Sequence, residues 1–191
     1  MEFDQRDMQK KAALMGLIFG LIALVTGIGG LYIVASSSSI AGALGFQVLR
    51  SFVIPLSLAV LFAIILRKQI GGYWSFRQAT SGIFLLFFTA YFVYSLGDLG
   101  YKQAVDSTLE TKALQNTIKV TVDFVSKQKM PTDQLDDKIT QMEEAMEASK
   151  HVSPGAIAQG MLAFILIIFV VSLVFAAIFK REQPLFEEEE L

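Results

Sequence analysis

Four long runs of apolar residues constrain this chain more than any other feature of its sequence. They cover residues 12–34, 47–66, 79–96 and 155–179, and only the second contains a charged side chain, Arg50 near its start. At 1.5 Å per residue, an α-helix of about 20 residues crosses a hydrocarbon core about 30 Å thick. A soluble helix of this length would show a polar face, which these runs lack. The sequence therefore predicts an all-α membrane protein with four transmembrane helices.

Charged residues divide the chain into three parts. They make up only 18% of the residues, against 53% hydrophobic ones, and they gather outside the apolar runs. Residues 1–97 hold the N-terminal tail and the first three spans, and residues 154–191 hold the fourth span and an acidic tail. Between them, residues 98–153 form a charged segment that we expect to fold outside the membrane.

Lysine and arginine in the short flanks of the spans predict the orientation, because cytoplasmic loops carry an excess of both. The short loop 36–46 has neither residue. The other short flanks contain Arg6, Lys10, Lys11, Arg67, Lys68, Arg77, Lys180 and Arg181. We therefore expect a multi-pass protein of the bacterial inner membrane with both termini in the cytoplasm and residues 98–153 extracytoplasmic.

The extracytoplasmic segment is expected to be a helical hairpin. Its first arm is ambiguous, because residues 118–124 alternate between apolar and polar, which is typical of a strand. A lone strand would have no partner, so we favour a helix whose apolar face holds Leu114, Ile118, Val122 and Val125. The second arm shows one narrow apolar stripe at helical spacing, formed by Leu135, Ile139, Met142 and Met146. We expect the two apolar faces to bury each other.

Small residues recur along one helix face in two spans, at intervals of four or seven. Such residues let helix backbones approach closely in lipid, where apolar burial contributes little to helix association. They are Gly16, Gly20 and Gly27 in the first span and Ala156 and Gly160 in the fourth. The two interpretations are homodimerisation and packing between helices of one chain, and we favour the second. The oligomeric state stays open.

The second span contains two further notable residues. Pro55 removes a backbone donor and is expected to kink the helix. Arg50 lies about one turn inside the outer end of the same span, at a depth similar to that of Asp98. Arg50 either forms an ion pair with Asp98 across the bundle or extends to the lipid headgroups.

Residues for catalysis and metal binding are scarce. The chain has no cysteine and one histidine, His151, so cysteine chemistry is excluded and a histidine cluster cannot form. The net charge of −2 gives no basic field for nucleic acid. The spans carry no carboxylate of the kind that ion-coupled transport needs. We expect no catalytic residues, no metal site and no cofactor.

The loop between the second and third spans has a distinctive pattern. Gly71 and Gly72 favour a tight turn, Trp74 is expected at the membrane interface, and the motif Gly-Gly-x-x-Ser-Phe-x-x-Ala ends at Ala79. With the four spans, the long third loop and the exit to Lys180, Arg181 and Pro184, it resembles an uncharacterised bacterial membrane family known as domain of unknown function 4199. The resemblance implies a four-helix inner-membrane protein of Gram-negative bacteria, and it carries no assigned activity.

These features favour a non-enzymatic accessory or scaffolding subunit of an envelope complex. Its partners would be the lipid bilayer and, through the external hairpin, another envelope protein. One alternative is a small oligomeric channel or transporter. A second alternative is a lipid-modifying enzyme that uses the basic residues of the loop between spans two and three.

Overall fold

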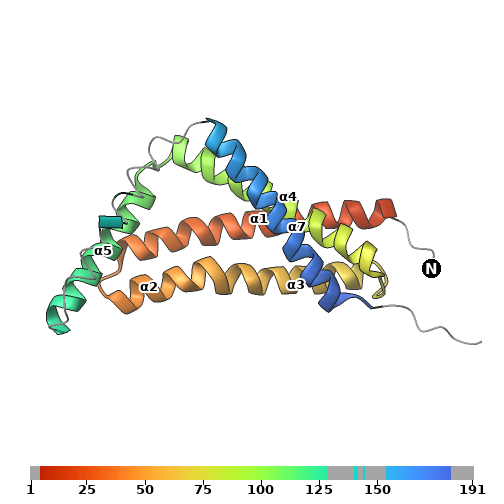
Figure 1. The fold of residues 1–191 in the computed structure, drawn as a ribbon, viewed down its shortest axis with the longest axis horizontal. Coiled ribbons are helices and arrows are strands. Elements are labelled where there is room, and N and C mark those ends of the chain that lie inside the picture. The colour runs from red at the N-terminus through yellow and green to blue at the C-terminus, as the bar shows by residue number, and fades with distance from the viewer. Residues whose placement is uncertain (1–4, 129–139, 142–143, 145–153, 182–191) are drawn as a thin grey trace, which may run out of the picture.

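The part of the chain that the computed structural model describes, residues 5–128, 140–141, 144 and 154–181, is helical and contains no β-strand. Figure 1 shows the arrangement of its helices, which are α1 (Gln5–Ser36), α2 (Ile40–Val48), the π-helix η1 (Leu49–Val53), α3 (Ile54–Gln69), α4 (Phe76–Ala104), α5 (Leu109–Gln128) and α7 (Pro154–Phe179). Four helical stretches are long and apolar enough to cross a membrane: Gln5–Ser36, Ile40–Gln69, Phe76–Ala104 and Gln159–Phe179. The chain is therefore an all-helical, multi-pass membrane protein, as the sequence predicts.

The second span is longer than its apolar run suggests. α2, η1 and α3 follow one another without a break from Ile40 to Gln69. The loop expected at residues 36–46 shrinks to residues 37–39, because Ser39 caps α2 by accepting a hydrogen bond from the Gly42 amide at 3.1 Å. The span thus begins well before residue 47, which places Arg50 deeper than expected.

Gly16 and Gly20 of α1 are packed against the backbone of α4 within one chain. A Cβ atom added to Gly16 would lie 2.6 Å from the Leu86 carbonyl oxygen, and one added to Gly20 would lie 2.7 Å from that of Ala90. The backbones of α1 and α4 can approach this closely only because both positions lack a side chain. In α7, by contrast, a Cβ at Gly160 would meet nothing within 4 Å, and the Ala156 side chain lies outside the described residues.

The turn between α3 and α4 anchors the end of α7. Gly71 and Gly72 have φ values of 102° and 84°, and Ser75 caps α4 in a capping box with Gln78. Trp74 is only 2% exposed, and its indole nitrogen donates a hydrogen bond of 2.8 Å to the Phe179 carbonyl. Its backbone also pairs with that of Arg181. The Trp74 ring is therefore buried within the protein, and its position at the membrane interface stays a prediction.

The helix α5 packs on the α1–α2 turn. Its start is ordered by Asp106, which accepts hydrogen bonds from Thr108 and Lys112, and these partners lower the pKa of Asp106 to about 2. Buried Leu109 and Ala113 then pack against the end of α1.

Two parts of the hairpin prediction change as a result. Residues 118–124 are helical, so the strand alternative is wrong. Val122 is exposed, so the face that α5 buries differs from the one expected. The cause is that α5 packs on α1 and α2, and the predicted second arm with Leu135, Ile139, Met142 and Met146 lies outside the described residues.

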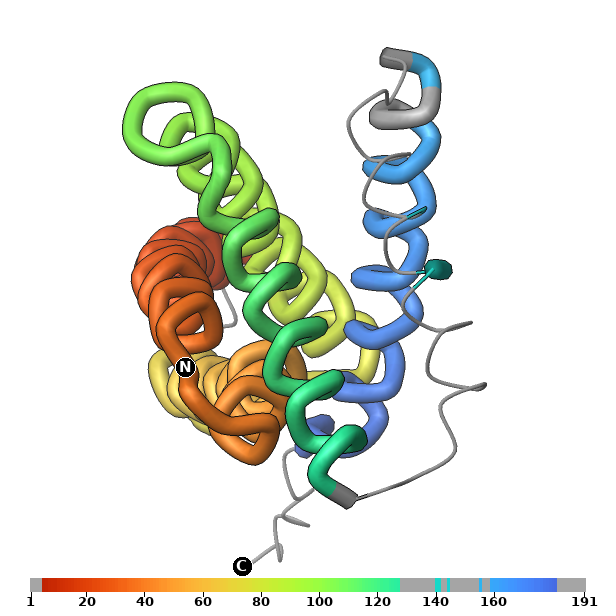
Figure 2. Tube along the Cα trace, turned by 90° about the vertical axis from the view of Figure 1, so that its left-hand side faces the viewer, coloured from red at the N-terminus to blue at the C-terminus, as the bar shows by residue number. Residues whose placement is uncertain are grey.

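The helices α4 and α7 lie together near the α3–α4 turn and diverge toward their other ends, as Figure 2 shows. Aromatic side chains join them, with ring centroids 5.2 Å apart for Phe87 and Phe175 and 4.3 Å apart for Tyr91 and Phe164. No packing contact of comparable extent joins α7 to α3 in the described part of the chain. This divergence leaves open space between α7 and the rest of the bundle.

Candidate functional site

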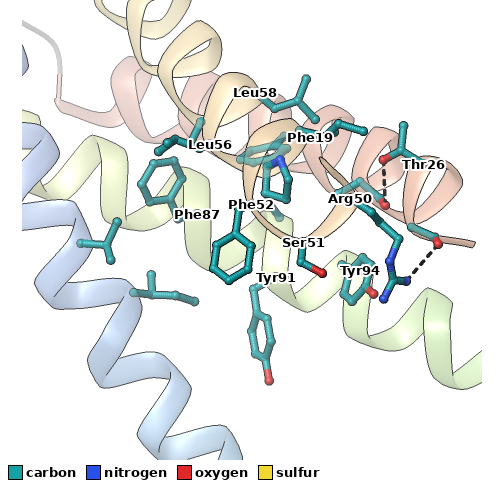
Figure 3. A pocket seen from close by; sticks show the side chains of 18 of the residues that line it. Phe19, Thr26, Arg50, Ser51, Phe52, Leu56, Leu58, Phe87, Tyr91 and Tyr94 are labelled. Atoms are coloured by element: carbon teal, nitrogen blue, oxygen red, sulfur yellow. Dashed lines mark hydrogen bonds between the residues drawn. The ribbon is translucent and has the colours of Figure 1, made fainter. Parts of the chain in front are cut away.

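A cavity of about 620 Å³ lies between the four spans, within the size range of small-molecule and lipid sites. Figure 3 shows it from close by. α1 contributes one wall, the stretch from Arg50 to Ala59 a second, α4 a third and α7 a fourth. Its lining residues are Phe19, Ala23, Thr26, Gly27, Arg50, Ser51, Phe52, Ile54, Pro55, Leu56, Leu58, Ala59, Phe87, Ala90, Tyr91, Tyr94, Phe164, Ile167, Ile168, Val171 and Phe175.

The two ends of the cavity differ in polarity. Toward the α3–α4 turn the lining is apolar, and Phe19, Phe87 and Phe175 lie in one aromatic cluster. Toward the α1–α2 turn the lining includes Arg50 and Tyr94. The cavity is therefore amphipathic along the direction of the spans.

The side of the cavity between α3 and α7 is open. Phe52 is 70% exposed, Leu56 59% and Ile167 55%, although all three line the cavity. These side chains lie within membrane-spanning helices, so the surroundings they face are lipid acyl chains. The cavity therefore opens sideways into the bilayer.

The side chain of Arg50 packs against two glycines of α1, Gly27 and Gly30. Nη1 donates a hydrogen bond of 3.1 Å to the Gly27 carbonyl. The aliphatic stem crosses Gly30, where an added Cβ would lie 2.5 Å from Arg50 Cδ. The same lack of a side chain at Gly27 makes room for the ring of Tyr94. Thus Gly27, predicted only as a packing residue, and Gly30, which sequence reasoning missed, together position the guanidinium.

The π-helix η1 presents this part of the second span to the cavity. The Ile54 amide donates to the Leu49 carbonyl, five residues earlier, and Pro55 follows at the start of α3. Proline lacks an amide hydrogen, and a wide turn of this kind accommodates the interruption of the helical ladder. The wider turn lets the consecutive residues Arg50, Ser51 and Phe52 all line the cavity.

The predicted ion pair between Arg50 and Asp98 is absent from the described part of the chain. Asp98 instead pairs with Lys102 at 2.7 Å, and Lys102 also pairs with Glu110 at 2.9 Å. Lys102 is one helical turn after Asp98 on α4, so this local pair forms without any movement between helices. Arg50 is left with the Gly27 carbonyl, and its buried Nε has no acceptor among the described residues.

Arg50 also lies deep in its span. The centre of the span from Ile40 to Gln69 falls between Ile54 and Pro55. At 1.5 Å per residue, Arg50 is about 7 Å from that centre along the axis. A hydrocarbon core extends about 15 Å to each side of its midplane, so a centred span holds the Arg50 backbone well inside the apolar region.

The chemistry of this lining favours binding over proton transfer. Arg50 carries a positively charged guanidinium with five N–H donors and no acceptor, so it attracts anions. The hydroxyl of Thr26 already donates to the Ile22 carbonyl at 2.8 Å. The remaining lining residues are mostly apolar or aromatic. Such a site suits a molecule with one acidic group and a long apolar part.

Comparison with known proteins yields one match. A family model described as "Protein of unknown function (DUF4199)" matches residues 14–181. No curated protein matches the chain. No solved structure matches it either.

Proposed function

The chain belongs to the DUF4199 family, and on that premise we propose that it is a non-enzymatic accessory protein of the membrane that holds a lipid in the cavity between its four spans. The observation that carries this proposal is the lateral opening of an apolar cavity between α3 and α7. A lipid is the occupant because membrane lipids surround that opening at high concentration. Their acyl chains are apolar, as is most of the cavity lining.

We further propose that the protein lies in the bacterial inner membrane with both termini in the cytoplasm. The support is that the basic flanks gather at one end of the bundle (Figure 1). Lys11 at the start of α1 donates a hydrogen bond of 3.0 Å to the Gln69 carbonyl at the end of α3. Arg181 after α7 pairs with Trp74 at the same end. Such a gathering of lysine and arginine marks the cytoplasmic side.

The test is to measure the lipid that the protein retains. The protein is purified in mild detergent, and retained lipid is counted by native mass spectrometry. We expect one tightly held lipid per chain. The variant Ala59→Phe, which fills the cavity from α3, is expected to lose it, because the added ring occupies the space of the acyl chain. The matched variant Ala41→Phe places the same ring at an exposed site on α2, outside the cavity, and is expected to keep the lipid.

Two outcomes would contradict this function. A protein that retains no lipid has no lipid site of the kind proposed. Equal retention by Ala59→Phe and Ala41→Phe, with both variants monodisperse and equally resistant to heat, would show that lipid binds elsewhere. If Ala59→Phe does not fold, Ala23→Leu tests the same cavity from the wall formed by α1.

A further inference from the structure

We propose that the lipid held in this cavity is an anionic phospholipid whose phosphate is bound by Arg50. The proposal rests on the lipid-binding function above and adds the chemical class of the ligand. It follows from the depth of Arg50, from the lack of an anion beside it among the described residues, and from the polarity of the cavity.

The depth of Arg50 means that its charge needs a partner. A lone arginine near the centre of a membrane helix is unfavourable, and such residues face a cavity or pair with another group. Arg50 is only half-buried, and it lines the cavity together with Tyr94 (Figure 3). Its charge is therefore directed to the cavity side of the span.

The described residues supply no carboxylate to neutralise this charge. Asp98, which the sequence places at a depth similar to that of Arg50, forms an ion pair with Lys102 at 2.7 Å. Arg50 makes one hydrogen bond, to the neutral Gly27 carbonyl, whereas a guanidinium offers five donors. A phosphate accepts paired hydrogen bonds from the N–H groups along one edge of a guanidinium, which a single neutral carbonyl does not.

The position of Arg50 along the cavity sets the orientation of the ligand. Arg50 and Tyr94 lie at the end toward the α1–α2 turn, and the cluster of Phe19, Phe87 and Phe175 lies at the opposite end. A phospholipid placed with its phosphate at Arg50 directs one acyl chain toward this aromatic cluster. Its second chain leaves through the open side between α3 and α7, where Phe52 and Leu56 are exposed. The amphipathic cavity thus matches an amphipathic ligand with a negative headgroup.

The experiment compares retention of an anionic and a zwitterionic lipid. The full-length protein is reconstituted into nanodiscs that contain equal amounts of phosphatidylglycerol and phosphatidylcholine, and the lipid retained after transfer to detergent is identified by native mass spectrometry. Both lipids carry a phosphate, but in phosphatidylcholine the choline ammonium offsets its charge, so the wild-type protein is expected to prefer phosphatidylglycerol by about tenfold. Arg50→Gln is expected to abolish the preference while a lipid is still retained. Arg50→Lys, which keeps the charge, is expected to restore part of it.

Two further variants test whether the lipid preference depends on the position of the Arg50 charge or only on the number of positive charges in the protein. Arg77→Gln removes a positive charge at the exposed start of α4 and is expected to leave the preference unchanged. Gly30→Val keeps Arg50 but places a side chain where the Arg50 stem now lies, so it is expected to weaken the preference. Gly30→Val also serves as the second probe if Arg50→Gln does not fold.

Three results would overturn the proposal. Equal retention of the two lipids by the wild-type protein, or an unchanged preference in Arg50→Gln, would show that Arg50 does not select the headgroup. A retained free fatty acid would show that the acidic group is a carboxylate. In each case a lipid is still held, so the proposed function survives, whereas complete absence of retained lipid contradicts the function itself.

Discussion

The Cβ atom that alanine would add at Gly20 would overlap the backbone of α4, because it would lie 2.7 Å from the Ala90 carbonyl oxygen and 2.7 Å from Val93 Cβ. Neither of these atoms belongs to the end of a flexible side chain, so the helices must move apart to relieve the overlap. Close contact of helix backbones is the main source of packing energy between spans in lipid. A single methyl group at this position therefore acts on the largest interface of the bundle.

We predict that Gly20→Ala destabilises the protein by roughly 1–3 kcal/mol, the range for overpacking in a tight core. The measurement is thermal or denaturant-induced unfolding in one detergent. Gly29→Ala is the matched control on the same helix, because a Cβ there meets nothing within 4 Å. Both variants gain the same intrinsic helix propensity, so their difference reports the overlap alone. Equal stability of the two variants would show that α1 and α4 are not packed as described.

Arg50 is a large side chain whose position depends on the absence of a side chain at a neighbouring glycine, Gly30. Its stem occupies the space that a side chain at Gly30 would fill, and its Nη1 donates to the Gly27 carbonyl. The surface that contacts Arg50 is thus made of backbone atoms of another span, α1. The positions of glycines in the sequence do not predict such a contact with arginine, because glycines in a span also allow close packing of helices.

At the scale of elements, the apolar contacts that hold α5 on the bundle are joined by a side chain that donates hydrogen bonds at the end of α1. Asn116 Nδ2 donates to the carbonyls of Val34 and Ser37, both at 2.8 Å. The last carbonyls of a helix lack their usual partners within it, and Asn116 supplies a donor to the Val34 carbonyl, which also accepts from the Ser37 amide at 3.3 Å. The contact joins an element outside the spans to the turn between the first two of them.

We predict that Asn116→Ala loosens α5 from the α1–α2 turn, because each lost hydrogen bond contributes about 0.5–1.5 kcal/mol. Alanine favours the helix more than asparagine does, so any loosening reflects lost docking and not weaker helix formation. Amide hydrogen exchange over residues 109–128 is expected to become faster, with α4 unchanged. Gln115→Ala changes the neighbouring exposed position and is expected to leave exchange as in the wild-type protein. Similar exchange in both variants would rule out the docking role of Asn116.

At the scale of the whole molecule, the two ends of the bundle differ in charge and in connection. One end holds the basic flanks and is tied together by the Trp74 hydrogen bond to Phe179. The other end holds the α1–α2 turn and α5, and there α4 and α7 diverge (Figure 2). The molecule is thus closed at the end that we propose to be cytoplasmic, and it opens sideways toward the other.

The proposed orientation predicts which sites a membrane-impermeant maleimide reaches. The chain has no cysteine, so each single-cysteine variant reports one position. Ser38→Cys and Lys127→Cys are expected to be labelled on the outside of sealed cells. Lys68→Cys and Lys180→Cys are expected to be labelled only after the membrane is opened. All four positions are exposed in the structure, so a lack of labelling reports the membrane and not burial within the protein. Labelling of Lys68→Cys in sealed cells would contradict the orientation.

The sequence by itself determined the parts of this protein that depend on local free energies. The four apolar runs predict the spans because transfer of about 20 apolar residues into a bilayer is favourable whatever lies beside them. Gly71 and Gly72 predict a turn because glycine alone adopts positive φ at no steric cost.

Only the tertiary structure decided the features that depend on contacts between distant segments. The burial of Trp74 depends on where α7 ends, the docking of α5 depends on the carbonyls at the end of α1, and the choice of Lys102 over Arg50 by Asp98 depends on helix placement. The cavity likewise exists because α7 diverges from α3. An apolar side chain has a similar free energy against lipid and against another helix. Hydropathy therefore predicts which helices lie in the membrane, but it does not predict how they pack against one another.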